Sequence, residues 1–264
     1  MNNAMPESVA SLARLRRRIA RIEGVRPADT GARFATGHDG VDRWLGGGLA
    51  SGRLHELMTG EGEDAGSLAG FAAMLALRAG EGSSDTGKAL LWLRTETAEK
   101  ACGRLYATGL GELGLDGRDV LLGLVADDAA LLKAANDAAR CAGLGALVVE
   151  TWGDPRGLDL TATRRLMLAA EASGVTVLLL RAGARECPSV ADTRWQVAPA
   201  PSLPLADGTP EGAPGHPVFD ITLLRRRAGP AGRQWRVEWN RERRCFQPPE
   251  RPALPGAVLP VAAG

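Results

Sequence analysis

Short apolar runs alternate with longer helical stretches through the middle of this 264-residue chain, and no other feature of the sequence restricts the fold as strongly. Consecutive parallel strands need a crossover between them, usually a helix. The alternation therefore predicts an α/β fold with a mostly parallel β-sheet flanked by helices. The predicted strands are 53–58, 88–94, 119–125, 145–150 and 175–181, and the predicted helices between them are 66–79, 96–107, 127–141 and 158–173.

Two later runs, 218–227 and 233–240, are joined by Ala-Gly-Pro-Ala-Gly and predict a C-terminal antiparallel hairpin. The segment 199–217 is rich in proline and glycine, which predicts a surface loop. With hydrophobic residues at 45%, the chain can bury one substantial core. A single main domain is therefore predicted over 34–246.

The two ends of the chain are predicted to be appendages of that domain. Apolar residues recur at every third or fourth position over 9–23, which predicts an N-terminal helix within 1–24 whose other face is basic. That face suits phosphate groups or an acidic partner, and it suits a simply solvated helix face equally well. Glycine and proline in 25–33 predict a linker, and the proline-rich tail 247–264 is predicted to be disordered or extended.

Charge and composition exclude several classes of protein. The formal net charge of +1 and the pI near 7.7 give no strong overall field for nucleic acids, so any basic function must be local. No apolar run approaches the roughly 20 residues of a membrane-spanning helix, and the N-terminus lacks a signal-peptide core. A cytoplasmic protein without membrane contact is predicted. The four cysteines form no CxxC pair, so neither a metal site nor a disulfide is expected.

The glycine-rich segment 34–67 is compatible with an ordinary loop, but the order of its elements is more specific than that. A Thr-Gly, an Asp-containing turn and a Gly-Gly-Leu-x-x-Gly run lead into the first strand, which resembles the entry to the RecA family core. The resemblance implies a RecA-like domain that ends in the antiparallel hairpin. It is carried by Thr36, Gly37, Val41, Asp42, Leu45, Gly47, Gly48, Leu49, Gly52 and Arg53.

In the RecA family the first strand ends in a phosphate-binding loop, GxxxxGK[ST], which holds a nucleotide and magnesium. The corresponding run begins at Gly60, but Ala65 stands at the second glycine and Gly66 at the lysine, while Ser67 keeps the hydroxyl. Three carboxylates of this run would repel a triphosphate, at roughly 1 kcal/mol per close pair even in water. The degenerate nucleotide loop therefore predicts no nucleotide cofactor and no ATPase activity. Weak anion binding at the start of the next helix stays open.

Two acidic residues stand at other positions that the RecA resemblance marks as functional. Glu96 corresponds to the water-activating glutamate after the second strand, but a carboxylate that begins a helix is the simpler interpretation. Glu150 ends a strand where the family places the acid that organises magnesium, and its chemistry would still suit that role. We interpret both as inherited remnants, so no catalytic residue is predicted.

Among RecA relatives that have lost the phosphate loop, residues 9–246 are most similar to the ImuA family. The basic N-terminal helix, the segment 34–57, the degenerate loop, the strand around Trp92 and the terminal hairpin carry this similarity. It implies a non-catalytic accessory protein of SOS-induced translesion DNA synthesis. Such a protein joins an inactive, ImuB-like Y-family polymerase homologue to an error-prone C-family DNA polymerase. RecA association and a weak DNA contact stay open.

Two other functions remain as alternatives. A SulA-like cell-division inhibitor, which blocks FtsZ, comes from the same degenerate group, but such proteins are typically shorter and are not expected to carry the basic helix and the full hairpin. An active ATPase of the RecA or KaiC kind needs a triphosphate site that the loop 60–67 does not supply.

Arginines and tryptophans concentrate around the predicted C-terminal hairpin. This mixture provides interface anchors and also suits single-stranded DNA. It is also the pattern of an edge strand whose alternate residues pack inward while its arginines are solvated. We predict contact with a polymerase-like partner through Arg225, Arg226, Arg227, Trp235, Trp239, Arg241, Arg243 and Arg244.

Overall fold

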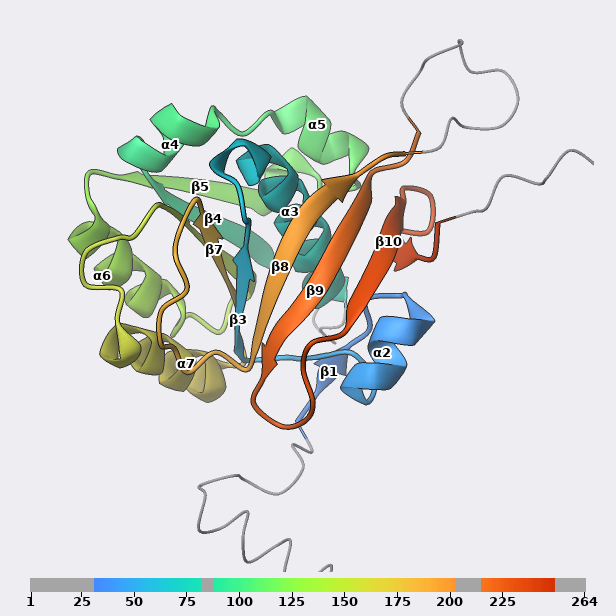
Figure 1. Ribbon diagram of the computed structural model, residues 1–264. Coiled ribbons are helices and arrows are strands. Elements are labelled where there is room, and N and C mark those ends of the chain that lie inside the picture. The colour runs from blue at the N-terminus through green and yellow to red at the C-terminus, as the bar shows by residue number, and fades with distance from the viewer. Residues whose placement is uncertain (1–30, 82–87, 203–214, 250–264) are drawn as a thin grey trace, which may run out of the picture.

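The computed structural model describes residues 31–81, 88–202 and 215–249, and its centre is a nine-stranded sheet (Figure 1). The strand order is β11-β10-β9-β8-β3-β7-β6-β4-β5. Neighbours from β8 to β5 pair in parallel, whereas β8 with β9, β9 with β10 and β10 with β11 are antiparallel. The bounds are β3 Leu54–Met58, β4 Ala89–Thr95, β5 Val120–Val125, β6 Leu144–Trp152, β7 Thr176–Ala182, β8 Thr193–Ala200, β9 Val218–Arg226, β10 Gln234–Asn240 and β11 Cys245–Gln247.

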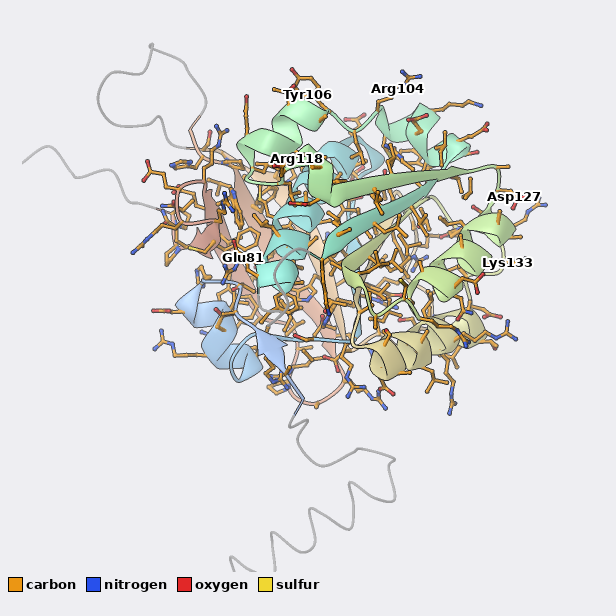
Figure 2. The ribbon with its side chains drawn as sticks, turned by 180° about the vertical axis from the view of Figure 1, so that it is seen from behind. Glu81, Arg104, Tyr106, Arg118, Asp127 and Lys133 are labelled. Atoms are coloured by element: carbon orange, nitrogen blue, oxygen red, sulfur yellow. The ribbon has the colours of Figure 1, made fainter. Side chains whose placement is uncertain are left out.

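Helices cover both faces of the parallel part of the sheet. The long helix α3 packs on one face, and α6 and α7 pack side by side on the other. Seen from behind, Lys133 of α6 and Tyr106 before α5 lie at the outer surface (Figure 2). The bounds are α2 Asp39–Leu45, α3 Ala65–Glu81, α4 Glu96–Cys102, α5 Ala107–Glu112, α6 Asp128–Ala138 and α7 Leu160–Ser173, with short 3-10 turns η1 Gly62–Asp64 and η2 Gly117–Asp119.

Side-chain alternation along the strands builds two hydrophobic cores. On the central strand β6, Val148 faces the α3 core and Val149 faces the α6/α7 core. The sheet is therefore buried on both faces there, which is why its strands read as continuous apolar runs in the sequence. Local signals fix the helix ends: the Asp159 carboxylate caps α7 at its start, and Gly174 ends it with φ 82°.

A small second sheet pairs β1 (Arg33–Phe34) with β2 (Leu49–Ala50) in antiparallel fashion. Gly48 permits the close approach, because its φ is 108° and a Cβ there would lie 2.1 Å from the Phe34 carbonyl oxygen. The pairing brings Arg33 next to the amino end of β3.

The predicted α/β architecture with a mostly parallel sheet and a C-terminal antiparallel hairpin is confirmed. All predicted strands are present, whereas the helix expected over 96–107 ends at Cys102 as α4, and α5 begins only at Ala107. Strand β8 was missed, and the loop predicted over 199–217 begins while β8 still continues to Ala200. The tail predicted from 247 likewise begins inside β11.

The N-terminal helix predicted within 1–24, most of the linker 25–33 and the tail from 250 onward lie outside the described residues. Within the parts of the chain that are described, no helix has both the length and the apolar character needed to cross a bilayer.

Candidate functional site

The degenerate nucleotide loop follows β3 at the carboxyl end of the parallel strands. Gly60 is exposed, a 3-10 turn spans Gly62–Asp64, and α3 begins at Ala65, whose side chain is buried. Gly66 is exposed in the first turn of α3, and Ser67 is half-buried beside it. The loop thus keeps the strand–turn–helix path of a phosphate-binding loop, but no lysine projects from it.

An indole packs directly against this loop. Trp152 ends β6, and a Cβ added to Gly62 would lie 2.9 Å from the six-membered ring of Trp152. The same ring borders Gly183, which follows β7, and the Gly183 N–H faces Thr59 Oγ1 at 3.4 Å. The carboxyl end of the sheet is therefore closed on the inner side of the loop by Trp152 of β6 and Gly183 after β7, while Gly60, Glu61 and Glu63 stay exposed.

Glu150 lies in the core and both of its carboxylate oxygens have partners. Trp92 Nε1 donates to Glu150 Oε2 at 2.7 Å, and Arg94 Nη2 donates to Glu150 Oε1 at 3.0 Å. Glu150 is 3% exposed and Arg94 is 1% exposed, so this is a desolvated ion pair between β4 and β6. Within the described part of the chain, no group of three or more His, Cys, Asp or Glu side chains is placed to hold a metal ion.

Sequence analysis missed Arg94, although a signal was present. Arg94 and Glu150 occupy paired register positions at the ends of two neighbouring apolar strands. An arginine at the end of a buried strand needs a buried counter-charge, and an acid at the same level of the next strand provides it. The same pair affects Cys102 of α4: burial, followed by the charge of Glu150, raises the pKa of this thiol to about 11.

Glu96 differs from the buried pair because its side chain is exposed. It is the first residue of α4, where Thr95 provides the cap by accepting from the Ala98 N–H. Its exposed carboxylate lies 3.8 Å from Lys100 Nζ one turn later. The position is that of an ordinary helix-start carboxylate, favoured by the helix dipole.

The structure divides the predicted C-terminal arginine cluster between opposite ends of the hairpin. Arg225 and Arg226 end β9 and Arg227 follows it, beside the start of β8, whereas the later arginines follow β10 at the other end. Arg225 donates to the Ser189 carbonyl. The guanidinium of Arg226 donates to the Trp44 and Leu45 carbonyls, both at 2.8 Å. Only Arg227 of these three is exposed.

The second arginine group lies in the turn between β10 and β11. Arg241, Arg243 and Arg244 are all exposed. Arg241 lies 3.9 Å from Glu112 at the end of α5, and the Arg243 N–H donates to Asn240 Oδ1 at 2.8 Å. Arg244 has φ 49°, the only positive value among the described non-glycine residues. Three positive charges are therefore presented on one tight turn.

The two hairpin tryptophans point into the core. Trp239 is 0% exposed and packs on Phe246, so the prediction that it anchors a partner is wrong: in this fold its side chain belongs to the core. Trp235 is half-buried and contacts the rings of Trp44 and Trp195. Trp235 and Trp239 thus lie on the same face of β10, the face that packs on the core.

Two relatives support a family assignment. Protein ImuA of Caulobacter vibrioides strain NA1000 / CB15N is 34% identical over 201 residues, which cover 71% of this chain and 75% of the relative. The same values hold for Protein ImuA of strain ATCC 19089 / CIP 103742 / CB 15. The chain belongs to the ImuA family. No established family profile matches it.

The fold of this ImuA-family chain is RecA-like. The crystal structure of the RadB recombinase aligns with a TM-score of 0.51, covering 82% of this chain and 100% of that one. Sequence identity is only 15%, so the likeness concerns the fold alone. The ImuA-family chain therefore combines a recombinase-like sheet with a closed, lysine-free loop and an internally paired acid.

Proposed function

We propose that this ImuA-family protein is a non-catalytic accessory protein of SOS-induced translesion DNA synthesis. In this role it joins an ImuB-like inactive Y-family polymerase homologue to an error-prone C-family DNA polymerase. Family membership and the RecA-like fold support the process. The contacts at the carboxyl end of the sheet support the non-catalytic role.

One observation carries the non-catalytic part: both oxygens of Glu150 accept hydrogen bonds from core side chains. An acid that organises magnesium needs free oxygen lone pairs facing solvent or phosphate. Releasing Glu150 for a metal would leave Arg94 buried without its counter-charge, at a cost of about 3–5 kcal/mol. Nucleotide chemistry would therefore work against the stability of the fold.

Calorimetry with Mg·ATP and a sensitive phosphate-release assay test this proposal. We expect neither binding nor turnover in the wild type. We expect the same from the double variant Ala65→Gly with Gly66→Lys, because it restores the loop residues but leaves Glu150 paired. Turnover above background that is lost in the exposed-site variant Glu96→Ala would refute the non-catalytic role.

The partner-binding part rests on the exposed turn Arg241–Arg244. Its charges face solvent, where they can accelerate encounter with an acidic surface. We expect the triple variant Arg241→Glu, Arg243→Glu and Arg244→Glu to stay folded and to bind the ImuB-like homologue at least tenfold more weakly. We also expect wild-type binding to weaken as salt rises.

A matched control reverses three exposed charges elsewhere: Lys133, Arg164 and Arg165, each replaced by Glu on α6 and α7. It changes the net charge by the same amount, so a loss confined to the turn variant assigns the contact to the turn. Equal losses in both variants would mean only a general charge effect. Unchanged binding in the turn variant would contradict the proposed interface.

A further inference from the structure

A groove lies between α6 and α7, the two helices that cover one face of the parallel sheet. It measures ≈ 550 Å³ and is lined by α6, by the first half of α7 and by the connection that leads from β6 into α7. Pockets of about 300–1,000 Å³ accommodate ligands larger than a single ion. The groove therefore has room for several side chains of a partner.

Apolar side chains form the floor of the groove, and hydrogen bonds hold its walls. Leu166 of α7 is 1% exposed, and Leu132 of α6 is half-buried. The Arg156 N–H donates to Asp128 Oδ2 at 2.9 Å, which ties the connection to the start of α6. Asp159 caps the start of α7 with its carboxylate. Because these contacts set the shape of the groove in advance, docking requires little rearrangement.

Three basic side chains rim the groove without a partner. Lys133 of α6, Arg156 of the connection and Arg165 of α7 are exposed, and Figure 2 shows Lys133 at the outer surface. Within the described ranges, none of these three side chains forms a hydrogen bond or an ion pair. Asp159 in the wall and Asp128 beside it each accept a backbone hydrogen bond already. Three exposed cations thus face two carboxylates that are engaged elsewhere.

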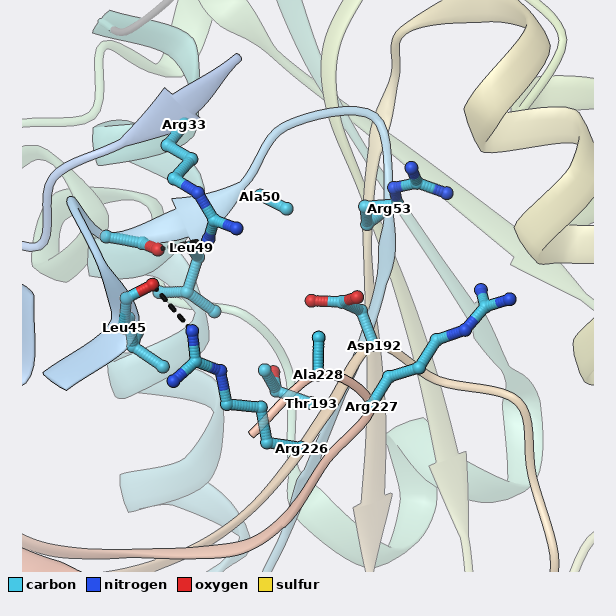
Figure 3. Close-up of a pocket in the computed structure, with 11 residues that line it drawn as sticks. Arg33, Leu45, Leu49, Ala50, Arg53, Asp192, Thr193, Arg226, Arg227 and Ala228 are labelled. Carbon is cyan, nitrogen blue, oxygen red and sulfur yellow. Dashed lines mark hydrogen bonds between the residues drawn. The ribbon is translucent and has the colours of Figure 1, made fainter. Parts of the chain in front are cut away.

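The arginines around the small cavity at the amino end of the strands differ in this respect (Figure 3). Arg226 donates to the Leu45 carbonyl at 2.8 Å, and Arg53 forms an ion pair with Glu171. Those guanidinium groups are occupied within the protein, whereas the cations of the α6/α7 groove are available to a partner.

We propose that the α6/α7 groove docks a short acidic peptide segment of a partner protein. Apolar side chains of the segment lie on Leu132 and Leu166, and its carboxylates meet Lys133, Arg156 and Arg165. Guanidinium groups bind carboxylates with paired hydrogen bonds, and a groove between helices suits a peptide that presents apolar anchors. Charge complementarity therefore selects an acidic segment, and the apolar floor selects a peptide.

Other occupants match the groove less well. No aromatic side chain lines it within the described part of the chain, so the bases of a nucleic-acid strand have no ring to stack on. The protein's own N-terminal segment is rich in arginine over 14–21 and has the same sign of charge as the rim.

This inference goes beyond the proposed accessory function and uses none of the residues in the turn Arg241–Arg244. The acidic segment is expected in a protein other than the ImuB-like homologue, whose contact is proposed at that turn. The variant with Lys133, Arg164 and Arg165 replaced by Glu should therefore keep its affinity for the ImuB-like homologue while it loses acidic peptides. Either proposal can fail without the other.

The test is a selection of random twelve-residue peptides displayed on phage, with the full-length wild-type protein as bait. The folded double variant Lys133→Glu with Arg165→Glu removes peptides that bind elsewhere. We expect the enriched peptides to combine acidic with large apolar residues. Synthetic copies should bind the wild type saturably in fluorescence polarisation, and their affinity should fall as salt rises.

Two groove variants and one control measure where these peptides bind. We expect at least a tenfold higher Kd in Lys133→Glu with Arg165→Glu. Ala129→Asp, at an exposed position in the groove wall, adds one carboxylate and should also weaken binding. Arg43→Glu with Arg104→Glu reverses two exposed charges outside the groove and should bind like the wild type.

Thermal melting first establishes that each variant is folded. The inference is overturned if the enriched peptides are not acidic, or if folded groove variants bind them as the wild type does. It is also overturned if no peptide prefers the wild type to the groove variant, or if a single-stranded oligonucleotide binds the groove in place of acidic peptides.

Discussion

The two ends of the same parallel strands hold their charged side chains in different ways. At the carboxyl end, Arg94 and Glu150 neutralise each other inside the core, and an indole packs on the loop. At the amino end, arginines line a small cavity near the surface, where Arg226 donates to backbone carbonyls and Arg53 pairs with Glu171. The comparison shows two ways in which this sheet holds its arginines: one inside the core on a carboxylate, the others at its rim on backbone carbonyls and surface carboxylates.

Buried and exposed charges make different demands on stability. A buried pair stabilises the fold only while both partners are present, whereas an exposed arginine is hydrated and contributes little through its ion pairs. Substitutions at the closed carboxyl end should therefore affect folding strongly. Substitutions of the outer arginines at the amino end should affect folding little.

The largest effect is expected for Arg94→Ala, which leaves Glu150 buried beside Trp92 with no counter-charge. The free energy of unfolding should fall by about 3–5 kcal/mol in urea titrations. Lys100→Ala breaks only the exposed pair with Glu96 and should cost less than about 1 kcal/mol. A small loss in Arg94→Ala would mean that the pair is solvated and that the carboxyl end is not closed.

The sequence predicts some of the residues in this comparison and misses others. Glu150 was placed on the correct strand, because a long apolar run leading to an acid is visible in one segment, but the strand continues past it to Trp152. Its partner Arg94 lies 56 positions earlier and becomes its neighbour only through the strand order. The Arg-lined cavity was missed for the same reason, since Arg33 was assigned to a linker and Arg53 only to the entry of a strand.

Strand β8 was missed for a different reason. Its buried residues include the polar Thr193 and Arg194, and the exposed Gln196 separates Trp195 from Val197, so no continuous apolar run marks the strand. Pro199 near its end further suggests a loop. The interpretation of Trp239 failed because side chains alternate between the two faces of β10, and the sequence does not say which face meets the core.

The second prediction concerns Cys102, whose thiol is affected by Glu150 at the closed end. Its pKa is raised to about 11 from 9.0, so at pH 8 the reactive thiolate is roughly a hundredfold rarer than in an unperturbed cysteine. Alkylation of Cys102 by iodoacetamide should be correspondingly slow and should accelerate until about pH 11. The exposed Cys141 serves as the internal comparison by peptide mass spectrometry. Equally fast alkylation of both at pH 8 would show that Cys102 is not shielded.

The third prediction separates two adjacent arginines at the amino end. Arg226→Ala removes the guanidinium group that donates to the Trp44 and Leu45 carbonyls. The free energy of unfolding should therefore fall by about 1–3 kcal/mol. Arg227→Ala, which loses only a long contact with Glu171, should change stability by no more than about 0.5 kcal/mol. Thermal and urea melts compare them. Equal destabilisation would make Arg227 a structural residue and weaken the distinction between the two ends.

The smallest effect is expected at the degenerate loop itself. Gly66 lies in the first turn of α3, and a Cβ added there meets nothing within 4 Å, as is also true of Gly70 in the same helix. Because alanine restricts the unfolded chain more than glycine and no clash opposes it, Gly66→Ala should stabilise the protein by about 0.5–1 kcal/mol. Gly70→Ala is the control for the helix effect alone. If Gly66→Ala stabilises as Gly70→Ala does, the loop carries no strain kept for a ligand. If Gly66→Ala is destabilising while Gly70→Ala is not, the loop samples another conformation and the carboxyl end is less closed than its contacts imply.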